Sequence, residues 1–148
     1  MKAKKKCRIS YPTVRTFERA VEKLRREYPE DSINWKGGGR EQVTQAIAAA
    51  KWAFQLSRGK PCYARKLTAG AALFYEIAML HPLIDGNKRL AVVMLAAFLV
   101  KNRLPRPRPG SLYRVVLRVV SGEWSQEEVY QWLLRVYKAK RARRKRGG

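Results

Sequence analysis

The fold is decided by residues 67–101, which read LTAGAALFYEIAMLHPLIDGNKRLAVVMLAAFLVK. Two segments of this stretch, 67–80 and 87–101, are apolar almost all round. A helix without a polar face must be buried, so both are predicted to lie at the centre of a small helical bundle. Between them, Pro82 stops the first helix, and Gly86 gives the chain the freedom to turn before the second.

Amphipathic spacing predicts further helices over residues 13–28, 40–56 and 125–138. The last of these begins with Ser125 and Glu128, which have the spacing of a capping box.

The remaining segments are less regular. Residues 112–120 suit a strand or a helix, and we expect a helix because no second strand is present to pair with them. We expect residues 29–39 to form a loop with Trp35 as an anchor, 58–66 an irregular connector, and 104–110 an extended, proline-rich linker. The sequence thus predicts an all-α fold, a single compact bundle of about six helices.

Charge divides the chain into three parts. Its 148 residues carry 33 Lys and Arg against 11 Asp and Glu, a formal charge of +22. Five cations lie in residues 1–8 and seven in 138–148, whereas every acid lies between. Hydrophobic residues make up 46% of the chain, which is enough for a real core and excludes a disordered basic protein. We therefore expect a basic N-terminal arm over 1–11, a folded domain over 12–137 and a basic C-terminal tail over 138–148.

Several classes of protein are excluded. The longest apolar run, Leu90–Val100, is too short for a membrane span, and no apolar segment follows the basic N-terminus as in a signal peptide. Cys7 and Cys62 make no disulfide framework, and with a single histidine they form no Cys/His zinc site. Nothing in the sequence argues for pairing them. We expect a cytoplasmic protein that does not enter membranes.

The loop between the central helices, residues 81–89 (HPLIDGNKR), carries groups suited to phosphate chemistry. Free N–H groups at the start of the second helix favour an anion, and Lys88 and Arg89 add two cations beside them. Asp85 is placed to hold Mg²⁺ against a polyphosphate, and His81 supplies an imidazole that can act as a base.

A purely structural interpretation competes with this one. His81 at a helix end is often a packing or capping residue, and Asp-Gly-Asn is ordinary turn chemistry. However, Lys88 and Arg89 at a helix N-terminus oppose the helix dipole, so they cost stability unless an anion binds.

The loop resembles the signature of the Fic/Doc family, His-Pro-Phe-x-Asp/Glu-Gly-Asn-Gly/Lys-Arg. The apolar helix ending in Asn102, the segment Ser-Gly-Glu-Trp-Ser at 121–125 and the closing amphipathic helix are similar to the Doc (death-on-curing) branch. The resemblance covers about residues 12–137. It implies the all-helical Fic fold and transfer of part of a nucleotide to a protein hydroxyl.

The resemblance also implies roles for individual residues. His81 is expected to be the general base that takes the proton from a target Ser or Thr, and Asp85 to bind the Mg²⁺ that accompanies ATP. The residues expected to hold the phosphates are Gly86, Asn87, Lys88 and Arg89.

Three departures from the common Fic pattern bear on the reaction. Most AMP-transferring members have glycine at the position of Lys88 and a second arginine at the position of Val92. Lysine at position 88 is typical of the Doc branch, in which the γ-phosphoryl group is transferred. Leu83 replaces the usual phenylalanine, a change that affects packing only. Val92 replaces an arginine, and a ligand for phosphate is therefore missing there.

The leading hypothesis is therefore a Doc-like toxin that phosphorylates a Ser or Thr of a target protein, with a translation elongation factor as one candidate. The alternatives are an AMP-transferring Fic enzyme and a basic nucleic-acid-binding module with an inactive Fic site. The chain has no inhibitory helix of the Fic kind, so a separate antitoxin with an acidic or disordered segment is the expected restraint. The basic arms add nucleic acid or the ribosome as possible partners.

Overall fold

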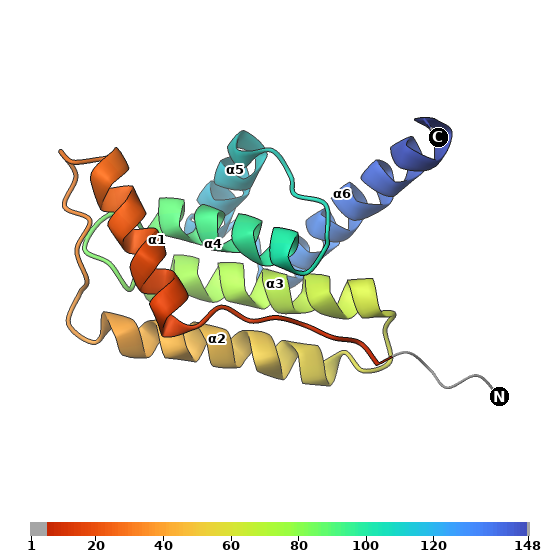
Figure 1. Cartoon of the computed structure of the whole chain (residues 1–148), viewed down its shortest axis with the longest axis horizontal. Coiled ribbons are helices and arrows are strands. Elements are labelled where there is room, and N and C mark those ends of the chain that lie inside the picture. Colours follow the sequence, from red (N-terminus) through yellow and green to blue (C-terminus); the bar gives the residue numbers. More distant parts are fainter. Residues whose placement is uncertain (1–5, 148) are drawn as a thin grey trace.

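The computed structural model describes residues 6–147 and shows a bundle of six helices (Figure 1). The helices are α1 (Val14–Glu27), α2 (Gly39–Leu56), α3 (Cys62–Leu80), α4 (Asn87–Lys101), α5 (Pro109–Val120) and α6 (Gln126–Gly147). In this part of the chain the only extended pairing is an isolated bridge between Trp35 and Leu83. The prediction of an all-α fold is confirmed.

Helix α3 is the centre of the bundle and packs against α2, α4, α5 and α6, while α1 crosses α2 and α4 (Figure 1). Small residues let α3 and α4 approach closely, because a Cβ on Gly70 would lie 3.0 Å from the Phe98 ring. On these two helices, Leu73, Phe74 and Leu95 are fully buried. The prediction that 67–80 and 87–101 occupy the core is therefore confirmed. None of the described helices is long and apolar enough to cross a membrane.

Three predicted boundaries are wrong. The expected connector 58–66 is irregular only in its first part, since α3 begins at Cys62, directly after Pro61, and Ala64 is already buried. The linker ends at Arg108, because proline is tolerated in the first turn and Pro109 begins α5.

The third error concerns α6, which was expected to end at about Lys138 and instead continues to Gly147. No proline interrupts it, and Ala, Lys and Arg are all strong helix formers. Residues 138–147 of the predicted tail are therefore the end of a helix. The capping box expected at its start is present, since Ser125 Oγ accepts from Glu128 N at 3.3 Å and Glu128 Oε1 accepts from Ser125 N at 3.1 Å.

The N-terminal segment before α1 is held against the bundle at two points. The buried Asn102 accepts from Ser10 N at 2.8 Å and donates to Ser10 O at 2.9 Å. Cys7 forms a disulfide with Cys62 at the start of α3, with 5.5 Å between the Cα atoms. No pattern in the sequence argues for pairing these cysteines, which are 55 residues apart. Residues 1–5 of the predicted basic arm lie outside the described residues.

Candidate active site

The loop between α3 and α4 begins at His81, whose backbone is unusual. His81 caps α3 with φ 54° and ψ 64°, in the left-handed region that residues other than glycine seldom adopt. This backbone conformation costs a non-glycine residue about 1 kcal/mol or more, so the surrounding structure must hold His81 in it. The imidazole of this strained residue is exposed to solvent.

Asn87 closes the loop from its far side. Its Oδ1 accepts from Leu83 N and its Nδ2 donates to Leu83 O, both at 2.8 Å. The side chain is therefore engaged within the loop. Asn87 can still contact an anion through its backbone N–H and the second hydrogen of Nδ2.

The N-terminus of α4 is left without a side-chain cap. Gly86 occupies the N-cap position with φ 89°, and a Cβ there would lie 3.3 Å from the buried side chain of Ile33. Because no side chain caps the helix, the backbone N–H groups of its first turn remain available to a ligand. These groups and the adjoining positive end of the helix dipole favour an anion.

The segment between α1 and α2 forms a wall beside this loop. In addition to the bridge between Trp35 and Leu83, Lys36 N donates to Pro82 O at 3.0 Å and Ile84 N donates to Asn34 O at 2.9 Å. Gly39 is required where α2 passes the loop, because a Cβ would lie 2.2 Å from Pro82 O. Trp35 therefore anchors this segment, as expected. It is partly buried against the core, and its backbone pairs with Leu83 of the candidate site.

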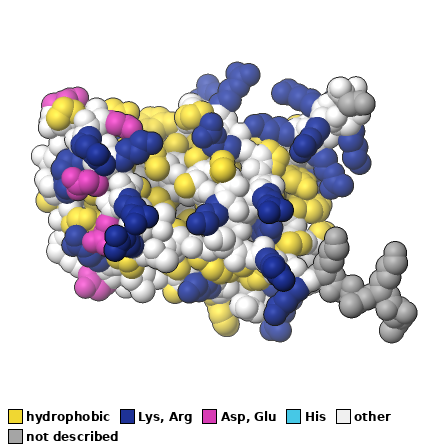
Figure 2. Space-filling view, viewed as in Figure 1, with side chains coloured by type: hydrophobic (Ala, Val, Ile, Leu, Met, Phe, Trp, Pro, Cys, Tyr) yellow, Lys and Arg dark blue, Asp and Glu magenta, His cyan; other side chains and the backbone are white. Residues whose placement is uncertain are grey.

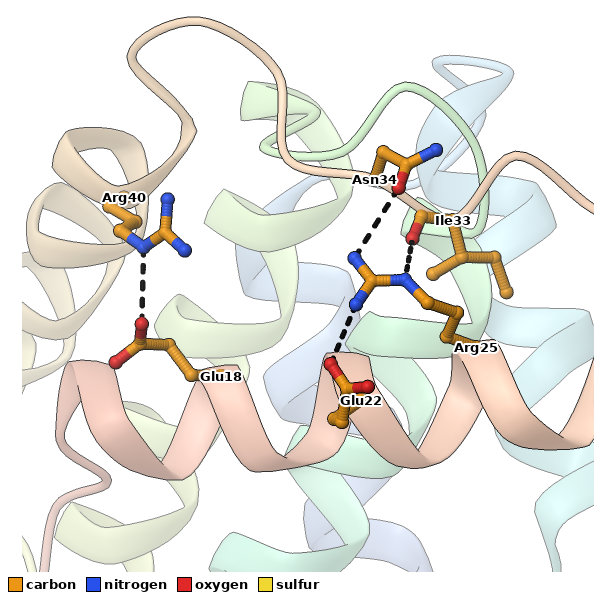
Figure 3. A network of polar contacts seen from close by, with 6 residues as sticks. All are labelled: Glu18, Glu22, Arg25, Ile33, Asn34 and Arg40. Atoms are coloured by element: carbon orange, nitrogen blue, oxygen red, sulfur yellow. Dashed lines mark hydrogen bonds and ion pairs between the residues drawn. The ribbon is translucent and has the colours of Figure 1, made fainter.

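Helix α1 holds this wall in place (Figure 3). Arg25 donates through Nε to Ile33 O at 3.1 Å and contacts Glu22 at 2.6 Å. On the same helix, Glu18 accepts from Arg40 Nε at 3.2 Å, and the Arg40 guanidinium lies 4.7 Å from the centre of the Trp35 ring. The backbone beside the loop is therefore tied to both α1 and α2.

A cavity of about 440 Å³ lies over the loop and the start of α4. The structure brings all six predicted site residues to its lining: His81, Asp85, Gly86, Asn87, Lys88 and Arg89. Four further lining residues were missed by the sequence analysis: Asp31, Ile84, Tyr113 and Val120. Ile84 occupies the variable position of the loop motif, and the other three, which come from the wall and α5, lie outside any motif.

Arg89 is the most firmly positioned cation of the cavity. Its NH1 donates to Asp31 Oδ2 at 2.5 Å, and its guanidinium lies 3.8 Å from the centre of the Tyr28 ring. The hydrogen bond to Asp31 raises the pKa of Arg89 above its usual range, so the residue stays charged. A guanidinium fixed on one side by a carboxylate and an aromatic ring presents its other donors in a defined direction.

Lys88 and Asp85 complete the lining of the site, whereas Val92 does not reach it. Lys88 is exposed, and Val92 lies one turn further along α4, half-buried and outside the cavity lining. Asp85 accepts from Gly86 N through Oδ1 at 2.8 Å and forms no ion pair within residues 6–147. Because Mg²⁺ is commonly held by one or two carboxylates together with substrate phosphates, an exposed carboxylate beside an anion site fits this cation.

The structure thus shows an all-helical bundle in which a loop that begins with a histidine leads into an uncapped helix start. The family model described as "Fic/DOC family" matches residues 18–99, and the chain belongs to that family. Its members are protein-modifying transferases that use ATP as a substrate, generally with a divalent metal. A comparison with curated proteins finds no match to this chain.

Proposed function

We propose that this protein is a Doc-like enzyme that transfers the γ-phosphoryl group of ATP to a Ser or Thr hydroxyl of a target protein. The observation that carries the proposal is the shared cavity. The exposed imidazole of His81, the uncapped start of α4 and the fixed guanidinium of Arg89 all face it. Phosphoryl transfer depends mainly on positioning and charge neutralisation, and these groups can supply both.

In the proposed reaction, the His81 imidazole takes the proton from the target hydroxyl. The hydroxyl oxygen forms a bond to the γ-phosphorus, while the bond from that phosphorus to the bridging oxygen breaks and ADP leaves. The N–H groups at the start of α4, together with Arg89 and Lys88, hold the phosphates during this step. Asp85 would hold Mg²⁺, which neutralises phosphate charge when it is bound.

Lys88 favours γ-phosphoryl transfer over AMP transfer. A glycine at this position would let a diphosphate approach the helix backbone closely, whereas the lysine side chain lines the cavity and adds a charge there. Val92 also lacks the guanidinium that would bind a second phosphate on the next turn. Both features argue against the AMP-transferring orientation of the nucleotide.

We further propose a setting for this activity. Use of ATP fits the cytoplasm, a translation elongation factor is a candidate target, and an antitoxin with an acidic or disordered segment is the expected inhibitor. The charge of +22 supports an acidic inhibitor, because opposite charges speed and strengthen the encounter.

The experiment that tests the proposal uses ATP labelled at either the α- or the γ-phosphate. Each is incubated with the full chain and either a purified elongation factor or a cell extract, with Mg²⁺ present. Transfer of the γ-label alone, lost in a His81→Asn variant, is the expected result. Asparagine tolerates the left-handed backbone of position 81, so this variant keeps the loop. Transfer of the α-label would establish AMP transfer instead, and no transfer of either label would contradict the proposed activity.

A further inference from the structure

Helix α6 ends in a strongly basic segment that projects from the bundle (Figure 1). We call residues 138–147 the basic helix end. Beyond Leu133, α6 has no buried residue, and the helix continues for almost four turns. The basic helix end carries seven cations and no acid: Lys138, Lys140, Arg141, Arg143, Arg144, Lys145 and Arg146. The family match ends at residue 99, so family membership does not account for this segment.

The cations of the basic helix end point to every side of the helix. At 100° per residue, the widest gap between neighbouring cations around the axis is about 80°. The uncharged residues of this segment are Ala139, Ala142 and Gly147. It therefore has no apolar face. Like charges three and four residues apart destabilise a helix, so this segment gains stability from a polyanion that neutralises them.

A basic groove lies between the basic helix end and the linker after α4. It has a volume of about 620 Å³, and its cations are Arg103, Lys140, Arg141, Arg144 and Lys145. Lys140 Nζ donates to Arg106 O at 2.5 Å, which ties the base of this segment to the linker. Figure 2 shows Lys and Arg side chains gathered at this end of the molecule, whereas the acids visible in that view lie at the opposite end.

We propose that the basic helix end binds duplex nucleic acid independently of its sequence, by entering the major groove of DNA. An α-helix with side chains is about 10–12 Å across, and the major groove of B-form DNA is about 12 Å wide with a row of phosphates on each side. A helix with cations on all sides is suited to such a groove. The groove beside the helix and Arg103 extend the same surface along the phosphate backbone.

Partners that contact only one face of a helix fit these observations less well. A membrane-surface helix needs an apolar face opposite its cations, and the basic helix end has none. An acidic peptide lies along one side of a helix and would leave the cations of the other side unpaired. The major groove of an A-form RNA duplex is deep and narrow, so DNA is the better fit among nucleic acids. This proposal does not depend on the proposed transferase activity.

The test compares three variants of the full chain, each lacking three cations. One removes charges from the groove side (Arg141→Gln, Arg144→Gln, Lys145→Gln), and one from the opposite side (Lys138→Gln, Arg143→Gln, Arg146→Gln). The matched control removes three exposed cations from one face of α1 (Arg15→Gln, Arg19→Gln, Arg26→Gln). Binding to a fluorescent DNA duplex of about 20 base pairs and random sequence is measured by anisotropy across a salt series.

Both α6 variants should bind DNA about tenfold or more weakly at physiological salt. In plots of log affinity against log salt concentration, the slope should become shallower by about 2–3, since each phosphate contact contributes about 0.9. The α1 control should bind like the unaltered chain, and circular dichroism should show that all variants remain folded. Loss from only one of the two α6 variants would overturn insertion into a groove, and equal loss in the control would show binding by net charge alone.

The same measurement with an RNA duplex, polyglutamate and phosphatidylserine vesicles tests the choice of partner. The DNA duplex should bind most tightly at matched salt. Tighter binding of the RNA duplex would overturn the assignment to DNA, and tighter binding of polyglutamate or of the vesicles would overturn the assignment to nucleic acid.

Discussion

Arg89 donates a hydrogen bond to Asp31 across 2.5 Å, although the two residues lie 58 positions apart in the chain. The contact joins the first turn of α4 to the segment after α1 and places a carboxylate beside the candidate phosphate site. Because the bond raises the pKa of Arg89, the stability that depends on protonation of Arg89 is fully present below the usual pKa of arginine. This part is lost as the pH rises through the raised pKa of Arg89, in strong alkali, so deprotonation of Arg89 should cause no pH dependence near neutrality.

Replacing Asp31 by Asn should strengthen nucleotide binding. The substitution removes a negative charge that repels the phosphates, while the amide oxygen can still accept from Arg89 and keep its guanidinium in place, so the Kd for ATP should fall several-fold. The free energy of unfolding should change by less than about 1 kcal/mol, because the ion pair is partly exposed. Calorimetric titration with ATP measures the affinity. Glu30→Gln, which removes an exposed charge from the same segment, should leave the Kd unchanged; an unchanged Kd in Asp31→Asn as well would show that Arg89 does not meet phosphate.

Replacing His81 by Asn should slow label transfer by about 10²–10⁴-fold while ATP affinity stays the same. A general base contributes to the rate of proton removal and not to the binding of phosphates. Initial rates of γ-label transfer, together with the Kd for ATP, separate the two effects. Transfer at the unaltered rate would make His81 a structural cap only.

Replacing Asp85 by Asn should abolish transfer and flatten the Mg²⁺ dependence of ATP binding. Asparagine keeps the acceptor for Gly86 N, at 2.8 Å in the native loop, but removes the charge that attracts the cation. Titration of ATP at several Mg²⁺ concentrations checks this outcome. If the variant keeps the native Mg²⁺ dependence, Asp85 is not the metal ligand.

Lys88 and Val92 together should determine which phosphate is transferred. Lys88→Gly should reduce γ-label transfer, because it removes a charge from the cavity lining. Adding Val92→Arg one turn further along α4 supplies a second guanidinium, and the double variant should gain slow transfer of the α-label. Mass spectrometry of the target distinguishes phosphate from adenylyl adducts. An adenylyl adduct made by the native chain would show that Lys88 does not select the γ-phosphoryl group.

Reduction of the disulfide between Cys7 and Cys62 should lower thermal stability. A bridge that closes a loop of 55 residues stabilises a fold by about 4 kcal/mol in the chain-entropy model, so dithiothreitol should lower the Tm by roughly 10 °C. Melting curves of the native chain with and without reductant measure the shift. In a variant with Cys7→Ser and Cys62→Ser, the reductant should have no effect; a native chain that is equally insensitive would show that the bridge adds no stability.

The sequence alone determined most of the helices and which chemical groups the loop carries, because both are local properties. Apolar residues at helical spacing mark the face that must be buried, and the loop from His81 to Arg89 carries its groups within nine residues. The end of α6 was predicted wrongly, since a run of charge was interpreted as a solvated tail although Lys, Arg and Ala favour a helix.

Only the tertiary structure decided which distant residues meet. Asp31 reaches Arg89, Tyr113 reaches the cavity, and Cys7 reaches Cys62 because the packing of α1, α5 and the N-terminal segment on the central helices brings them together. No spacing or motif in the sequence predicts any of these contacts. They result from the burial of apolar faces over the whole bundle, which a local pattern cannot specify.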